Sequence, residues 1–168
     1  MTMNLQRRSV IALAAAPVFG PALAQTLPPI RLWVGTPPGG STDTIAREIA
    51  VEMARTLGRN VIVENKSGAG GNIAADAVAK SAPDGTNLLV SFTSHTINAT
   101  LYPKLPYDPV ADFTPLTQLL TSSSVLVAHP SLPVASVKEL VPYARTRPGQ
   151  LSFAIGGIGS LLHLAGEA

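Results

Sequence analysis

The sequence is most constrained by a regular alternation of short apolar runs with helix-forming segments. Apolar runs typical of buried strands occupy residues 30–34, 61–63 and 88–92. Between them lie two helix-forming segments, at residues 41–57 and 72–80. Strands that alternate with helices pair in parallel, because each helix carries the chain back across the sheet. The sequence therefore predicts an α/β fold with a mostly parallel sheet and helices on its faces.

The first helix-forming segment carries start and stop signals. Ser41 or Thr42 is expected to cap its beginning with a side-chain oxygen. Gly58 stands where helix ends commonly require glycine. The apolar side chains of one face recur every four residues, at Ile45, Ile49, Met53 and Leu57.

The chain beyond residue 93 is less regular. A short helix is expected around residues 96–101, and two apolar runs follow at 115–120 and 125–128. Ser136 and Glu139 form a capping box, which predicts a helix that stops near residue 146.

The last segment repeats the strand, glycine turn and helix pattern of the first. Residues 151–155 are predicted to form a strand, and residues 156–160 a glycine-rich turn. A helix is expected to begin near Ser160 or Leu161.

Residues 1–24 have the three zones of a secretory signal peptide. Arg7 and Arg8 give a basic start, an apolar stretch follows, and small residues at Ala22 and Ala24 predict cleavage after Ala24. The alternative is a buried N-terminal helix. The arginine pair leaves open whether export follows the general or the twin-arginine route. The sequence therefore predicts a protein exported to the periplasm.

Composition excludes several classes of protein. Without residues 1–24, the chain has ten basic and ten acidic residues, so no cluster of positive charge suggests a nucleic-acid partner. The chain contains no cysteine, which excludes disulfides and thiol chemistry. No second apolar run reaches the length of a transmembrane helix.

Three junctions between a strand and the following helix are candidate ligand sites, at residues 37–43, 93–96 and 156–160. Such junctions lie at the carboxyl edge of a parallel sheet, where ligands bind. The first and the last also present free backbone N–H groups at a helix start, where a carboxylate or phosphate is favoured. The alternative is that all three are ordinary caps and turns, since every such loop needs these residue types.

Enzyme motifs in the sequence are incomplete. The run from Gly68 to Ile73 resembles a dinucleotide fingerprint but lacks its third glycine. Ser160 is not on a Gly-x-Ser-x-Gly elbow, and His163 and Glu167 have no third partner for a metal. We therefore expect no catalytic residue, metal or cofactor, with an exported hydrolase that uses Ser160 and His163 as the alternative.

Several segments in sequence order resemble the Bug family, the solute receptors of tripartite tricarboxylate transporters. The run Pro37-Pro38-Gly39-Gly40-Ser41-Thr42-Asp43 is similar to the first-loop motif of that family. The resemblance continues through residues 63–73, 82–85, 101–109, 130–134 and 163–167. Together these segments extend over nearly all of the chain after residue 24, and their common order makes the match specific.

The resemblance implies a two-lobed, hinged fold of the type II periplasmic-binding-protein class, which closes around a small organic acid. Residues 25–113 would form the first lobe and residues 114–168 the start of the second. The residues expected to bind the ligand are Gly39, Gly40, Ser41, Thr42, Asp43, Ser94, His95, Gly159, Ser160 and His163. Asp43 is itself acidic, so we expect it to orient the loop or accept a ligand donor.

The resemblance also implies membrane transporter subunits as partners and a receptor that is a monomer when full length. A ligand sensor with a signalling partner is the alternative. In the family, the chain completes the second lobe and then returns to the first. This sequence stops about two turns into an apolar helix, so we expect a second lobe that is truncated. We also expect the 168-residue chain to bind poorly and to aggregate on its own.

Overall fold

The computed structural model describes residues 27–168, so the predicted signal peptide and its cleavage after Ala24 lie outside the described residues. The strands are β1 (Ile30–Val34), β2 (Val61–Asn65) and β3 (Asn87–Val90). The helices are α1 (Ser41–Leu57), α2 (Asn72–Ala79), α3 (Ser94–Leu101), α4 (Val137–Arg145) and α5 (Leu161–Glu167), with a single 3-10 turn, η1 (Ala69–Gly71), before α2.

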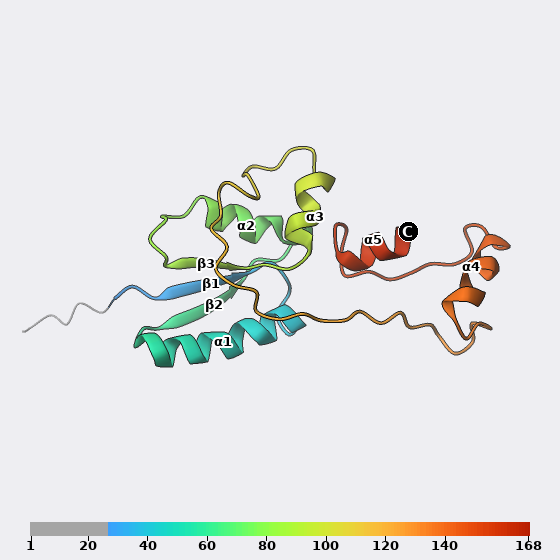
Figure 1. Ribbon diagram of the computed structural model, residues 1–168, viewed down its shortest axis with the longest axis horizontal. Coiled ribbons are helices and arrows are strands. Elements are labelled where there is room, and N and C mark those ends of the chain that lie inside the picture. Colours follow the sequence, from blue (N-terminus) through green and yellow to red (C-terminus); the bar gives the residue numbers. More distant parts are fainter. Residues whose placement is uncertain (1–26) are drawn as a thin grey trace, which may run out of the picture.

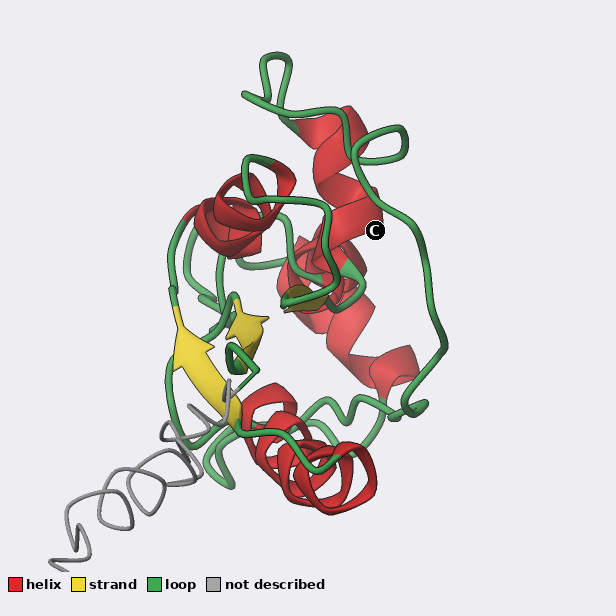
Figure 2. Cartoon of the chain, turned by 90° about the vertical axis from the view of Figure 1, so that its left-hand side faces the viewer, coloured by secondary structure: helices red, strands yellow, loops and turns green. Residues whose placement is uncertain are grey.

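The three strands form one parallel sheet in the order β2-β1-β3. Helix α1 connects β1 to β2 along one face of the sheet, and α2 connects β2 to β3 along the other (Figure 1). Viewed from the side, the strands lie between helices on both faces (Figure 2). The α/β prediction is therefore confirmed. From β1 the chain first adds β2 on one side and then β3 on the other, so the strand order reverses at β1. Ligands of such sheets bind beside the carboxyl ends of the strands at this point.

The core lies between the sheet and α1. Ile30, Leu32 and Val34 of β1 are at most 4% exposed, and they pack with Ala46 and Ala50 of the helix. The small alanine side chains let α1 approach the sheet closely, and the β-branched residues suit the pleated surface. This packing fixes the position of the first turn of α1 relative to the end of β1.

The predicted side-chain cap of α1 is wrong. The helix begins at Ser41, so the cap position falls on Gly40, which has no side chain to offer. The loop is instead fastened by Asp43, whose carboxylate accepts the N–H of Gly39 at 2.8 Å. At the other end, Gly58 has φ of 59°, which confirms the predicted glycine stop.

The capping box of α4 is confirmed. The hydroxyl of Ser136 accepts the N–H of Glu139 at 3.4 Å. The carboxylate of Glu139 reaches back to the N–H of Ala135 at 2.8 Å.

Beyond residue 113 the chain leaves the sheet and runs as an extended segment to α4 (Figure 1). The predicted strand at residues 151–155 is wrong, because no strand occurs in residues 114–168. A strand needs a hydrogen-bonded neighbour, and within the described residues none pairs with this segment. The apolar side chains of this region lie open, with Val125 78% and Val127 81% exposed. None of the helices within residues 27–168 has the length and hydropathy needed to cross a membrane.

Candidate ligand-binding site

Three loops meet at the carboxyl edge of the sheet. They are loop 1 (residues 35–40), the glycine-rich segment 66–71 and the segment 91–93 that leads into α3. Loop 1 and the glycine-rich segment are in close backbone contact, since a Cβ atom on Gly35 would lie 2.7 Å from the Cα atom of Gly71. The parallel topology thus brings together segments that are up to 58 residues apart in the sequence.

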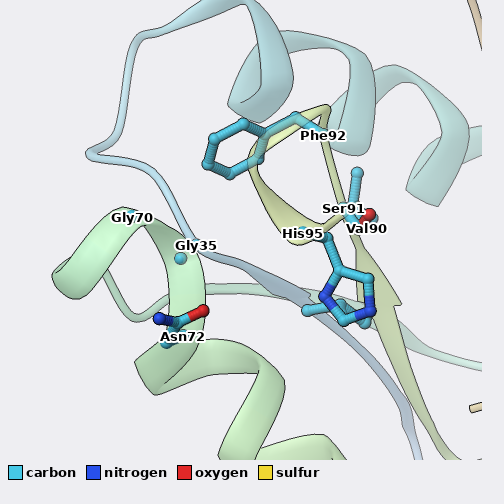
Figure 3. Close-up of a pocket in the computed structure, with 9 residues that line it drawn as sticks. Gly35, Gly70, Asn72, Val90, Ser91, Phe92 and His95 are labelled. Carbon is cyan, nitrogen blue, oxygen red and sulfur yellow. The ribbon is translucent and has the colours of Figure 1, made fainter. Parts of the chain in front are cut away.

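A small cavity lies beneath these loops, and Figure 3 shows its lining. Its volume is about 10 Å³, which is about the space of one water molecule. An organic acid does not fit in it. The surface available to such a ligand is therefore the open side of the loops above the cavity.

Loop 1 leads into the first turn of α1, which presents backbone donors at that surface. Gly39 has φ of 86°, a conformation that glycine adopts without strain. The N–H groups of Ser41, Thr42 and Asp43 belong to the first turn of α1 and have no acceptor within the helix. The dipole of this 17-residue helix adds partial positive charge at the same place. An anion is therefore favoured beside loop 1.

Asp43 is the buried anchor of this loop. Its side chain is 4% exposed and forms an ion pair with Arg47 at 2.9 Å. Hydrogen bonds from Arg47, from the Gly39 N–H and from Asn65 hold the pKa of the Asp43 carboxyl well below its usual range. The same ion pair raises the pKa of Arg47. Asp43 is therefore charged and fully engaged within the protein.

Of the two candidate residues at the start of α3, Ser94 is buried and His95 is half-buried. Ser94 is the first residue of the helix and is 1% exposed. The Nε2 atom of His95 lies 3.0 Å from the carbonyl oxygen of Pro109. The ring of His95 stacks on Tyr107 and meets Phe113 edge to face. Both residues therefore support the loops from below.

The glycine turn before α5 contacts the first part of the chain. Gly159 is buried and lies against the side chain of Asn98. On the same turn, the carbonyl oxygen of Ile158 would be 3.0 Å from a Cβ atom on Gly70. Residues 156–160 are thus brought to the edge that carries η1 and α3, although Figure 1 shows the preceding helix α4 far from the sheet.

The hydroxyl of Ser160 caps α5 by accepting the N–H of His163 at 3.1 Å. The Nδ1 atom of His163 lies 3.5 Å from the N–H of Gly159. The interaction between Ser160 and His163 therefore runs through the backbone of His163 and is a helix cap. Within residues 27–168, no group of three or more acidic or histidine side chains could hold a metal ion.

Sequence reasoning missed four residues that organise the edge, namely Asn72, Asn98, Arg47 and Asn65. Asn98 donates to the carbonyl of Gly70 at 3.0 Å and to Oδ1 of Asn72 at 2.9 Å, and it ties α3 to η1. Arg47 and Asn65 both donate hydrogen bonds to the Asp43 carboxylate. Arg47 stands four residues after Asp43, a spacing that places the two side chains together on a helix and that could have revealed it. Asn65 carries no such local signal, because its partners come from another part of the chain.

Comparison with known proteins agrees with this architecture. The family model described as the tripartite tricarboxylate transporter family receptor matches residues 45–168. The chain belongs to this receptor family. The protein BugT of Bordetella pertussis is 40% identical over 172 residues, which cover 98% of this chain and 53% of BugT. The chain spans about half the length of the curated relatives it matches.

Solved structures show the same fold class as the receptor family. The periplasmic binding protein BugD superposes with a TM-score of 0.68 at 35% identity, over 82% of this chain and 46% of BugD. An R. palustris protein solved with adipate has a TM-score of 0.65 at 36% identity, over 78% of this chain and 44% of that protein. The resemblance to a periplasmic binding protein of the Bug type is confirmed, and the family consists of receptors.

Proposed function

We propose that this chain is part of a periplasmic receptor that captures a small organic carboxylate for a tripartite transporter. The observation that carries the proposal is loop 1, which presents backbone N–H groups and the start of a long helix at the switch point of a parallel sheet. Adipate, bound by a relative of 36% identity, belongs to the same chemical class. Export by a signal peptide cleaved after Ala24 is part of the proposal.

The ligand lies between two lobes in this proposal, with residues 25–113 in the first and residues 114–168 in the second. On the first lobe, the contacts come from Gly39, Gly40, Ser41 and Thr42, which are exposed or half-buried on the open side of loop 1. The N–H of Gly39 donates to Asp43, so this residue offers the ligand a surface without a side chain. Ser41 and Thr42 offer hydroxyls and the free N–H groups of a helix start. Asp43 orients the loop, since its oxygens are occupied within the protein.

The second lobe contributes its glycine turn. Gly159, Ser160 and His163 lie at or beside the contact with η1 and α3, so a hinge motion that opens this contact would admit a ligand. Ser94 and His95 shape the floor from below and need not touch the ligand.

A thermal-shift screen tests the proposal. The protein is expressed from its complete gene and mixed with a panel of small carboxylates that includes adipate. A ligand at a hundred times its dissociation constant adds about 2.7 kcal/mol of stability. We expect a raised melting temperature with at least one acid, and a smaller rise for Thr42→Val. Thr56→Val, at the far end of α1, is the matched control and should respond like the wild type.

The hydrolase alternative is tested on the same samples. A hydrolase would turn over carboxylic esters, and Ser160→Ala would reduce that turnover by orders of magnitude. A folded protein that no acid stabilises, together with ester turnover that Ser160→Ala abolishes, would overturn the receptor proposal.

A further inference from the structure

Loop 1 is held at both of its ends by a side chain from the neighbouring strand. Asn65 is the last residue of β2 and is paired in register with Val34, the last residue of β1. Its amide nitrogen donates to the carbonyl oxygen of Thr36 at 3.1 Å, where the loop begins. The same nitrogen donates to Oδ1 of Asp43 at 2.9 Å, where the helix begins. One amide therefore connects the entry and the exit of loop 1.

Asp43 transmits this connection to the loop backbone. Its Oδ2 atom accepts the N–H of Gly39 at 2.8 Å and the Nε–H of Arg47 at 3.0 Å. Arg47 also donates from Nη2 to the Oδ1 atom of Asn65 at 3.0 Å, which fixes the orientation of the amide. The three side chains thus hydrogen-bond one another and together hold the N–H of Gly39.

The arrangement has an electrostatic consequence. Asp43 is a buried anion that lies beside the surface where an anion would bind, so an unpaired carboxylate there would repel the ligand. Arg47 balances that charge at 2.9 Å. Nε and Nη2 of the guanidinium bind Asp43 and Asn65, and the donors that the start of α1 offers a carboxylate are neutral backbone groups.

We propose that Asn65 is the positioning residue of the ligand site, acting on loop 1 through Asp43, with Arg47 fixing its amide and balancing the Asp43 charge. This inference rests on the proposed function for its effect on affinity. Its effect on the loop itself is independent of any ligand. Asparagine is required because only an amide of this length donates two hydrogens and accepts one.

The decisive variant is Asn65→Asp, which keeps the shape of the side chain, removes both donors and adds a negative charge beside Asp43. Asn65→Leu has a similar size and removes the donors without adding charge, so both variants are measured and the same direction of change is expected in each. The protein expressed from its complete gene is used, and amide hydrogen exchange is measured by NMR in the absence of ligand. We expect exchange at Gly39 to accelerate about tenfold, which is what loss of one hydrogen bond implies. Exchange in β1 should stay slow and shows that the variant is folded.

Arg47→Gln is the second variant, and it tests the part assigned to Arg47. Arg55→Gln is its matched control, because Arg55 pairs with Glu52 on an exposed part of the same helix.

Affinity for adipate is measured by calorimetry on the same proteins. We expect Asn65→Asp to weaken binding roughly ten- to a hundredfold, as for other residues that orient binding groups, and Arg47→Gln to weaken it less. Arg55→Gln should bind like the wild type. Combining Asn65→Asp with Asp43→Asn exchanges the amide and the carboxylate. The new amide at position 43 can then donate to the new carboxylate at position 65, so exchange at Gly39 should slow again. This partial rescue would not occur if Asn65 acted only by filling space.

The two proposals fail in different ways. If the wild type binds no acid of the panel, the proposed function fails, and exchange at Gly39 still decides the role of Asn65. If Asn65→Asp leaves both Gly39 exchange and adipate affinity at wild-type values in a folded protein, the positioning role is overturned. If Arg47→Gln proves harmless and Asn65→Asp does not, the part assigned to Arg47 is overturned.

Discussion

Gly35 and Gly71 lie so close together that a Cβ atom on Gly35 would fall 2.7 Å from the Cα atom of Gly71. The contact joins the end of β1 to the segment before α2, and a Cβ atom on Gly71 would in turn lie 3.2 Å from the Phe92 ring. At this point of the carboxyl edge, neither Gly35 nor Gly71 has room for a side chain.

The Gly35→Ala variant tests that close contact. The new methyl group meets backbone rather than a flexible side chain, so the loops must move apart. We expect the free energy of unfolding to fall by about 1–3 kcal/mol, measured by chemical denaturation. Gly156→Ala is the control, because a Cβ atom there meets no atom within 4 Å. Equal stabilities of the two variants would contradict the close contact.

The acid sensitivity of the protein should depend on Asp43. Its pKa is lowered in the folded state from the ordinary value of 3.8, mainly by its hydrogen bond with Arg47. A lowered folded pKa contributes stability that is fully present above the unfolded pKa and is lost as the pH falls toward the folded pKa. The stability difference between wild type and Asp43→Asn should therefore shrink as the pH falls below about 4.

Denaturation curves at about pH 6 and about pH 3 measure this effect. Glu52→Gln changes an exposed carboxylate on the same helix and serves as the control. A difference between wild type and Asp43→Asn that stays constant across this range would show that the charge of Asp43 does not stabilise the fold.

The hydroxyl of Tyr107 ties the segment after α3 to the start of α2. It donates to Oδ1 of Asn72 at 2.8 Å, and the tyrosine is 7% exposed. Removing it in Tyr107→Phe should cost about 1 kcal/mol of stability, which thermal or chemical unfolding detects. Tyr102→Phe removes a hydroxyl from the same segment outside this network and should cost less. The reverse order would rule out a stabilising hydrogen bond at Tyr107.

A chain of residues 25–168 produced alone should aggregate. Val125, Leu126 and Val127 are consecutive and are 78%, 66% and 81% exposed, and an extended apolar segment of this kind pairs readily with other chains. Light scattering after size-exclusion chromatography measures the outcome. A soluble monomer that melts cooperatively would contradict the expectation.

Local sequence patterns determined the elements of the β1–β3 unit. The four-residue spacing from Ile45 to Leu57 and the glycine at position 58 placed α1, and the strands lay where apolar runs stood between turns. The capping box at Ser136 placed the start of α4 in the same way. Each of these signals acts between residues a few positions apart, so it can be read without knowing the fold.

The tertiary structure alone decided how loop 1 is held and which segments pair. Asn65 acts on Thr36 and Asp43 from 29 and 22 residues away, and only the parallel register of β1 and β2 brings them together. The apolar run at residues 151–155 predicted a strand, and it formed none because no strand lies beside it within residues 27–168. Propensity is a property of the segment, whereas hydrogen-bond partners are supplied by the rest of the chain.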